Sequence, residues 1–205
     1  MSITEELNIS EILKGKSMGT KLYSPIFGDC TFSFIQGVTD AICVIANDNR
    51  EFFDYKGLYS PTGERQLFPS KEMRDWNKFQ WKKGDVLVSN DGKVKVIFDK
   101  FRSNTYLSFI GKYHIDNLEC NNPYYQQEGE YATGNFKLEE VDAAQTHINT
   151  IEERLGGKLN LETLEIEKNQ PEFKDGDIIK MTWNKYSAIV IFCEYSNFWK
   201  GFDSH

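Results

Sequence analysis

Short runs of alternating apolar and polar residues dominate the first third of the chain and predict β-strands. Turn residues separate these runs, as at Ser24-Pro25 and Asn47-Asp48-Asn49. The predicted strands cover residues 21–23, 30–35, 42–45, 51–54 and 66–68. Five short strands within about 50 residues are typical of a small antiparallel barrel. We therefore expect an all-β fold.

Helical periodicity occurs in only a few places. Residues 2–14 predict a short helix, because Ser2 and Glu5 have the spacing of a capping box. Residues 69–76 predict a single helical turn capped by Ser70. Apolar residues recur at helical spacing over 141–155, and Gly156-Gly157 ends that helix. A small hairpin is expected over 159–166.

The pattern of a glycine followed by two strands recurs along the chain. Residues 81–88 (WKKGDVLV) align with 173–180 (FKDGDIIK), and 94–98 (VKVIF) align with 188–192 (AIVIF). Residues 19–23 (GTKLY) occupy the same place as the glycine and first strand of the other two copies. We therefore predict three related units.

The predicted organisation follows from these patterns. An N-terminal helix (1–15) precedes a first small β-barrel unit (16–69) and a second one (70–140), a linking helix and hairpin (141–170), and a third unit (171–205). The third unit is shorter than the second, so we expect it to be incomplete, with an open sheet edge. Another unit or a partner chain would cover that edge, which makes an oligomer through this unit an expectation.

Two details of the second unit are also predicted. Asn90-Asp91-Gly92 suits a hairpin turn with two residues at positive φ. Residues 116–134 form a polar stretch that is longer than an ordinary connection, and we expect a functional or mobile loop there. Core packing is the expected role of the aromatic residues at strand or strand-entry positions: Phe79, Trp81, Phe98 and Phe192. For Trp76, near the junction between units, the sequence leaves two alternatives, burial against both neighbouring units or a surface position.

Composition and charge narrow the classes of function. Acidic residues outnumber basic ones by 31 to 24, a net charge of -7, which is the wrong sign for neutralising nucleic-acid phosphates. No apolar run approaches the roughly 18 to 20 residues that a membrane span requires. The N-terminus lacks the pattern of a secretory signal, so a cytoplasmic location is expected. The four cysteines form no Cys-x-x-Cys pair and are expected to be reduced, buried thiols.

Three segments carry a resemblance to a known group of proteins. Residues 20–28 (TKLYSPIFG), 67–76 (LFPSKEMRDW) and 84–88 (GDVLV) are similar to segments of uncharacterised proteins encoded by phages and prophages of gut bacteria. The resemblance covers nearly the whole chain. It implies small Src-homology-3-like barrels in tandem, joined by short helices, and it implies no activity or catalytic residues.

Candidate chemistry is sparse. A cysteine hydrolase would use Cys30 with His114, yet neither residue lies in a known catalytic signature. His114 and Cys120 lack the paired spacing of a zinc site, so no cofactor or metal is expected. An acidic mimic of nucleic acid would concentrate negative charge on one face, whereas Lys and Glu alternate along this chain. No catalytic signature is found, and we expect a protein that is not an enzyme.

Aromatic residues outside the predicted strands provide the remaining signal. Large rigid rings contact an extended peptide at little cost in conformational entropy. Tyr55 and Tyr59 lie in the turn-rich end of the first unit, and Tyr124 and Tyr125 lie in the long polar stretch. We expect these four tyrosines to contact an unidentified protein or peptide partner. The sequence therefore favours a protein-interaction or assembly module, with a connection to phages.

Overall fold

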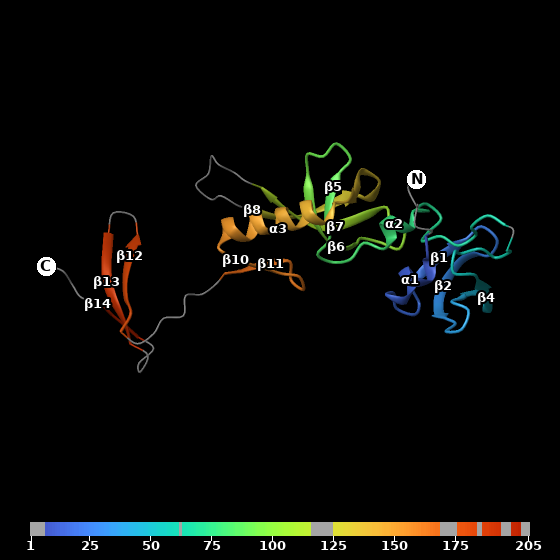
Figure 1. The fold of residues 1–205 in the computed structure, drawn as a ribbon, viewed down its shortest axis with the longest axis horizontal. Coiled ribbons are helices and arrows are strands. Elements are labelled where there is room, and N and C mark those ends of the chain that lie inside the picture. Colours follow the sequence, from blue (N-terminus) through green and yellow to red (C-terminus); the bar gives the residue numbers. More distant parts are fainter. Residues whose placement is uncertain are drawn as a thin grey trace. The chain divides into compact units, whose positions relative to one another are not determined.

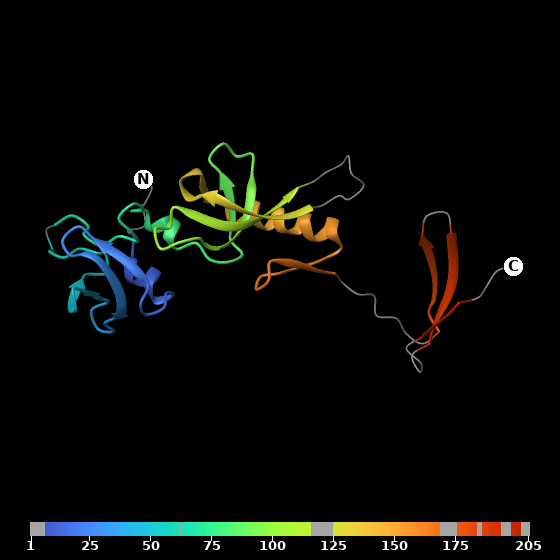
Figure 2. The same cartoon turned by 180° about the vertical axis from the view of Figure 1, so that it is seen from behind.

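The computed structural model describes residues 7–61, 63–115, 125–168, 176–183, 186–193 and 198–201. The chain forms two compact units, Met1–Glu167 and Lys168–His205 (Figures 1 and 2). It is rich in β-strands arranged as antiparallel sheets, and helices are few. Within the described ranges no sheet is closed into a complete barrel, because each has two end strands that are not paired with each other.

The first sheet contains four strands in sequential antiparallel order. They are β1 (Lys21–Ser24), β2 (Gly28–Ile35), β3 (Ile42–Ala46) and β4 (Asn49–Phe53). These confirm four of the predicted strands. The fifth, over 66–68, is reduced to a single antiparallel bridge between Phe68 and Tyr23 of β1. Asn47 and Asp48 form the β3–β4 turn with φ of 49° and 63°, so this two-residue hairpin is of the type that matches strand twist.

The second sheet contains five strands. In space they run β8 (Tyr125–Ala132), β7 (Ser108–Ile115), β6 (Lys95–Phe101), β5 (Val86–Ser89) and β9 (Phe136–Leu138). A short 3₁₀-helix, η1 (Thr133–Asn135), connects β8 to β9. The last strand returns beside the first, just as Phe68 returns beside β1 in the first sheet.

Two predictions for the second unit were wrong. The stretch over 116–134 is not a loop throughout, because residues 125–132 pair with β7 and Thr133–Asn135 are η1. Polar side chains can line the solvent face of an antiparallel strand, so polarity does not exclude a strand. At the β5–β6 turn only Gly92 has a positive φ (77°). Asp91 keeps an ordinary φ and its carboxylate accepts hydrogen bonds from the Ser89 hydroxyl and the Lys93 N–H.

Three glycines share one conformation, each before the first strand of one of the three larger sheets. Gly19, Gly84 and Gly176 have φ of 86°, 92° and 89°, and each lies two residues before a first strand. The Gly19 N–H donates to the Phe32 carbonyl (2.8 Å), and the Gly84 N–H donates to the Phe98 carbonyl (2.9 Å). A register shift follows directly after Phe32 in β2 and after Phe98 in β6. Only glycine adopts this φ without a steric cost.

The second compact unit holds a three-stranded antiparallel meander. Its strands are β12 (Ile178–Trp183), β13 (Tyr186–Cys193) and β14 (Phe198–Gly201). Ile178 and Ile189 are exposed and lie on one face, because the register places Lys180 opposite Ile189 and Ile178 opposite Ile191. The side chain of Phe192, which we expected in a core, lies outside the described residues.

Two of the predicted helices begin elsewhere. Helix α1 (Ile9–Lys14) starts after Asn8, whose side chain accepts the Glu11 N–H, so a helix continuous from residue 2 is wrong. Ser2 and Glu5 lie outside the described residues. Helix α2 (Trp76–Phe79) is capped by Asp75 and not by Ser70. Each helix begins at a residue whose side chain can accept a backbone N–H of the first turn.

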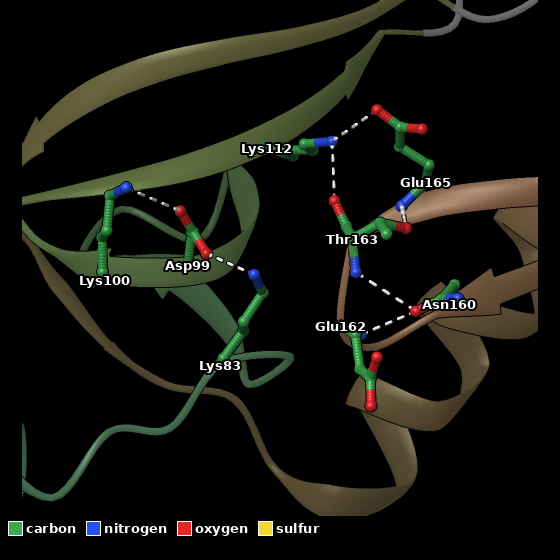
Figure 3. A network of polar contacts seen from close by, with 8 residues as sticks. All are labelled: Lys83, Asp99, Lys100, Lys112, Asn160, Glu162, Thr163 and Glu165. Carbon is green, nitrogen blue, oxygen red and sulfur yellow. Dashed lines mark hydrogen bonds and ion pairs between the residues drawn. The ribbon is translucent and has the colours of Figure 1, made fainter.

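Helix α3 (Val141–Leu155) and the hairpin that follows it confirm their predictions. Gly156 ends the helix in the left-handed conformation (φ 66°). Strands β10 (Gly157–Asn160) and β11 (Glu165–Lys168) then form the hairpin. The Lys112 ammonium on β7 donates to the Thr163 carbonyl (3.1 Å) and lies 3.6 Å from the Glu165 carboxylate, which ties the hairpin turn to the second sheet (Figure 3).

Aromatic rings connect the two sheets of the first compact unit. Phe101 stacks on Phe79 at a centroid distance of 6.4 Å and on Trp81 at 6.3 Å, with interplanar angles of 14° and 10°. Phe79 belongs to the core of the first sheet and Trp81 to that of the second, and Phe101 packs against both. The expected core packing of Phe79, Trp81 and Phe98 is confirmed, and of the two alternatives for Trp76 the structure shows burial.

Tyr106 adds a polar connection between the same sheets. Its ring packs into the core of the first sheet, and its hydroxyl donates to the Lys21 carbonyl (2.9 Å). Its φ is 59°, a strained value for a bulky residue. The Ser70 hydroxyl donates to the neighbouring Thr105 carbonyl (2.8 Å). The loop before β7 is therefore held against the first sheet.

We expect Trp76→Ala to destabilise the protein by about 3 to 5 kcal/mol, as other large-to-small core changes do. Trp76 is 1% exposed, and its indole N–H donates to the Leu67 carbonyl (3.1 Å). Urea unfolding followed by circular dichroism measures the change. Asn77→Ala, at an exposed position of the same helix, is the control. A loss below about 0.5 kcal/mol for Trp76→Ala would contradict a core role.

Candidate interaction surface

An apolar patch lies on the face of the first sheet that is opposite its core. Phe34, Ile45 and Phe52 contribute it and are 38%, 40% and 44% exposed. The register places Phe34 opposite Cys43 and Cys43 opposite Phe52, so these three residues form one row across β2, β3 and β4. We call Phe34, Ile45 and Phe52, with Cys43 between them, the outer patch.

A β-bulge in β2 places Phe34 on this face. Phe32 is paired with Val44 and is buried in the core of the first sheet. In a regular strand Phe34 would point to the same side as Phe32, because side chains alternate with a period of two. The register shifts between Phe32 and Phe34, and the extra residue, Ser33, turns Phe34 to the opposite face.

The rings of the outer patch cover a buried thiol. Phe34 and Phe52 meet edge to face, with centroids 6.4 Å apart. Cys43 lies in the row between them and is 0% exposed. Burial raises the pKa of the Cys43 thiol, and the nearby Arg50 charge opposes that shift only in part. Cys43 is therefore a packing residue beneath the two rings.

Arg50 forms the charged border of the outer patch. It is exposed and is paired with Ile45 across β3 and β4, so both side chains lie on the same face. Arg50 has no ion pair with any carboxylate in the described ranges. Aromatic residues and arginine are enriched at protein–protein interfaces. The outer patch thus has an apolar centre with a cation at its edge.

Tyr59, one of the tyrosines that the sequence singled out, packs on the core face of the first sheet, opposite the outer patch. Tyr59 is half-exposed, and its ring packs on Phe27 and Phe53 at centroid distances of 5.0 and 5.6 Å. Its hydroxyl donates to Glu51 (3.3 Å), and the Glu51 charge raises the pKa of Tyr59. The Tyr55 carbonyl accepts the Ile9 N–H at the start of α1 (2.8 Å), so part of its role is structural.

The other residues that the sequence analysis considered for binding or catalysis lie apart from the outer patch or outside the described residues. Tyr124 and Cys120 lie outside the described residues. Tyr125 and His114 lie on β8 and β7, with only their backbones described. Cys30 is buried and lies in β2 of the first sheet, whereas His114 lies in the second sheet. Burial together with the Asp29 charge raises the pKa of the Cys30 thiol to about 12. A thiol of this pKa is a poor nucleophile at neutral pH.

A cleft lined by both polar and apolar residues lies between α1 and α2. It has a volume of about 670 Å³, and its lining includes Glu11, Lys16 and Lys82. The Lys16 ammonium lies 4.6 Å from the centre of the Phe79 ring, and burial together with the Lys82 charge lowers its pKa. Glu11 pairs with Lys14. The lining contains no serine, cysteine or histidine among the described residues.

Comparisons with known proteins identify no relative of this chain. No family model, curated protein or solved structure matches the chain. In the described ranges no three His, Cys, Asp or Glu side chains lie close enough to hold a metal ion. None of the described helices is both long enough and apolar enough to span a bilayer.

The outer patch could not be found from the sequence pattern alone. Phe34 lies two residues after the buried Phe32, so regular alternation would place both in the core. Phe52 and Phe53 are both apolar, so the sequence does not show which of the two is buried. The available signal was the adjacent pair Phe52-Phe53, because neighbouring residues of a strand point to opposite faces. One of the two rings must then lie outside the core of a single sheet.

His147 on α3 is a partly buried titratable residue. Its Nε2 makes no hydrogen bond within the described ranges. Burial lowers the pKa of His147, the Lys95 charge lowers it further, and Glu139 opposes this effect. Lys95 and Glu139 are paired with each other (2.8 Å). His147 is therefore neutral in the folded protein at pH 7.

We expect stability to fall as the pH drops below about 6.5, the ordinary pKa of histidine in the unfolded chain. Below that pH the unfolded chain binds a proton that the folded protein binds only at lower pH. A single group contributes a slope of at most about 1.4 kcal/mol per pH unit. Urea unfolding at several pH values, with His147→Gln as reference, isolates this contribution. Parallel curves for the two proteins would contradict it.

We expect Cys30 and Cys43 to resist alkylation in the folded protein. The measurement uses iodoacetamide at pH 7.5 in a Cys120→Ser, Cys193→Ser background, with mass spectrometry of each site. With a pKa of about 12, Cys30 has roughly a thousandfold less thiolate than a free thiol. The same chain unfolded in guanidinium is the control. Fast labelling of Cys30 in the folded state would revive the cysteine hydrolase hypothesis.

Proposed function

We propose that this protein is a protein-interaction or assembly module whose outer patch binds a protein or peptide partner. The observation that carries the proposal is the edge-to-face pair of half-exposed rings, Phe34 and Phe52, with Ile45 beside them on a face that the core does not use. Contiguous exposed apolar side chains with a polar rim are typical of interaction sites.

We further propose that residues 16–69, 70–140 and 171–205 are related small barrel units of the Src-homology-3-like type. Three observations support this relation for the first two units. In each, a glycine at positive φ precedes the first strand, a register shift follows an equivalent phenylalanine, and a late segment returns beside the first strand. Gly176 extends the glycine feature to the third unit.

A setting in the cytoplasm during phage infection is part of the proposal. The resemblance of residues 20–28, 67–76 and 84–88 to phage and prophage proteins supports it. The charge distribution favours an interaction module over a nucleic-acid mimic, because carboxylates alternate with lysines that they contact. Examples are Asp99 with Lys83 (2.9 Å) and Lys100 (3.8 Å), drawn in Figure 3.

The proposal predicts that Phe34→Ser, Phe52→Ser abolishes capture of the specific partner. Tagged full-length protein is incubated with lysate of its host cell, and bound proteins are identified by mass spectrometry. The double variant loses apolar contact area but leaves the buried core residues unchanged, so we expect it to remain folded, which thermal unfolding checks. Greater alkylation of Cys43 in this variant reports that the rings no longer cover the thiol.

Val141→Ser is the control, since Val141 is an apolar residue that is 82% exposed and lies on α3, which is not part of the first sheet. We expect it to capture the same partner as the unaltered protein. Tyr59→Ala, and Tyr124→Ala with Tyr125→Ala, test the alternative contact residues. Loss of the partner only in a tyrosine variant would move the surface away from the outer patch. No specific partner in any arm would contradict the interaction function.

A further inference from the structure

The free edge of β4 borders the outer patch. Among the strands that the structure describes, β4 is paired only with β3, and both views draw it at the margin of its sheet (Figures 1 and 2). A strand at the end of a sheet has unpaired backbone N–H and C=O groups along one side. An extended segment of another protein can use such groups to add a strand.

The hairpin geometry identifies which backbone groups point outward. Ala46 and Asn49 flank a two-residue turn and therefore form a hydrogen-bonded pair. Hydrogen-bonded pairs alternate along an antiparallel ladder, so Glu51 and Phe53 also direct their backbone groups toward β3. Arg50 and Phe52 consequently direct theirs to the free edge. No hydrogen bond from either backbone to another described segment competes for them.

The same two residues carry the side chains at the border of the outer patch. Arg50 and Phe52 are two apart in β4 and lie on one face, next to Ile45 and Cys43 of β3. An added strand would place two of its own side chains, also two residues apart, beside them. An apolar residue of the partner beside Phe52 would gain apolar contact, since Phe52 is partly exposed. A residue beside Arg50 would face its positive charge, which has no ion pair in the described ranges.

We propose that the partner binds by adding an extended strand to the free edge of β4, with an acidic side chain beside Arg50 and an apolar side chain beside Phe52. This inference rests on the proposed interaction function and names the form of its partner. Charge complementarity selects the acidic residue. Glu51, the carboxylate between the two, lies on the opposite face and accepts a hydrogen bond from Tyr59, so it does not neutralise Arg50 there.

The test selects ligands from a displayed library of random ten-residue peptides against the full-length chain. We expect selected peptides to share an acidic and an apolar residue two positions apart. Arg50→Glu should lower the affinity for such an acidic peptide by at least about tenfold. Replacing the acidic residue of the peptide with lysine should restore the affinity for the Arg50→Glu variant. Selection of no peptides, or of peptides without this pattern, would overturn the proposal.

Backbone methylation separates strand addition from simple contact with the patch. One synthetic version of a selected peptide carries N-methyl groups at alternate residues, and a second carries them at the intervening ones. Only one set of N–H groups can face β4, so one version should lose at least about tenfold in affinity and the other should bind normally. Equal binding of both versions would overturn strand addition and leave the interaction function standing.

A size measurement tests the competing occupant, a second copy of the chain. Sedimentation of the unaltered protein and of Arg50→Glu at about 100 µM compares their association states. We expect both to sediment identically, because the strand proposed to pair with β4 is an acidic segment of another protein and not a second copy of this chain. A dimer that Arg50→Glu dissociates would overturn the proposal in favour of self-pairing. Val141→Ser serves as the unrelated surface control.

Discussion

Stacking of Phe101 between Phe79 and Trp81 is the contact on which the first compact unit depends. Each sheet alone is small, and an isolated layer of a few strands buries too little apolar surface for stability. Phe101 packs against both cores, so the two sheets share one continuous set of aromatic side chains. The strained backbone of Tyr106 is retained because its ring and hydroxyl both contact the first sheet.

This shared core uses one face of the first sheet and leaves the other available. Phe32, Val44 and Phe53 point into the core, whereas Phe34 and Phe52 lie on the outer face. The outer rings contribute little to joining the sheets, since the core rings already make those contacts. They leave apolar area in contact with water on that face, and this is the surface that we propose for binding.

The bulge after Phe32 links the fold to that surface. An equivalent register shift follows Phe98 in the second sheet, where a glycine at positive φ also precedes the first strand. A feature shared by both sheets is explained most simply by their common geometry, because bulges increase strand twist and curvature. In the first sheet the same shift has a further effect, since it turns Phe34 outward and completes the outer patch.

Local sequence alone determined most of the secondary structure. Strands β1 to β4, helix α3 and the hairpin after it follow from alternation, capping residues and glycine stops, which act within a few residues. Tertiary structure decided the rest. A one-residue bulge reversed the face of Phe34, pairing with β7 made a strand of the polar residues 125–132, and distant rings met at Phe101. These outcomes depend on partners far away in the chain, which local periodicity does not contain.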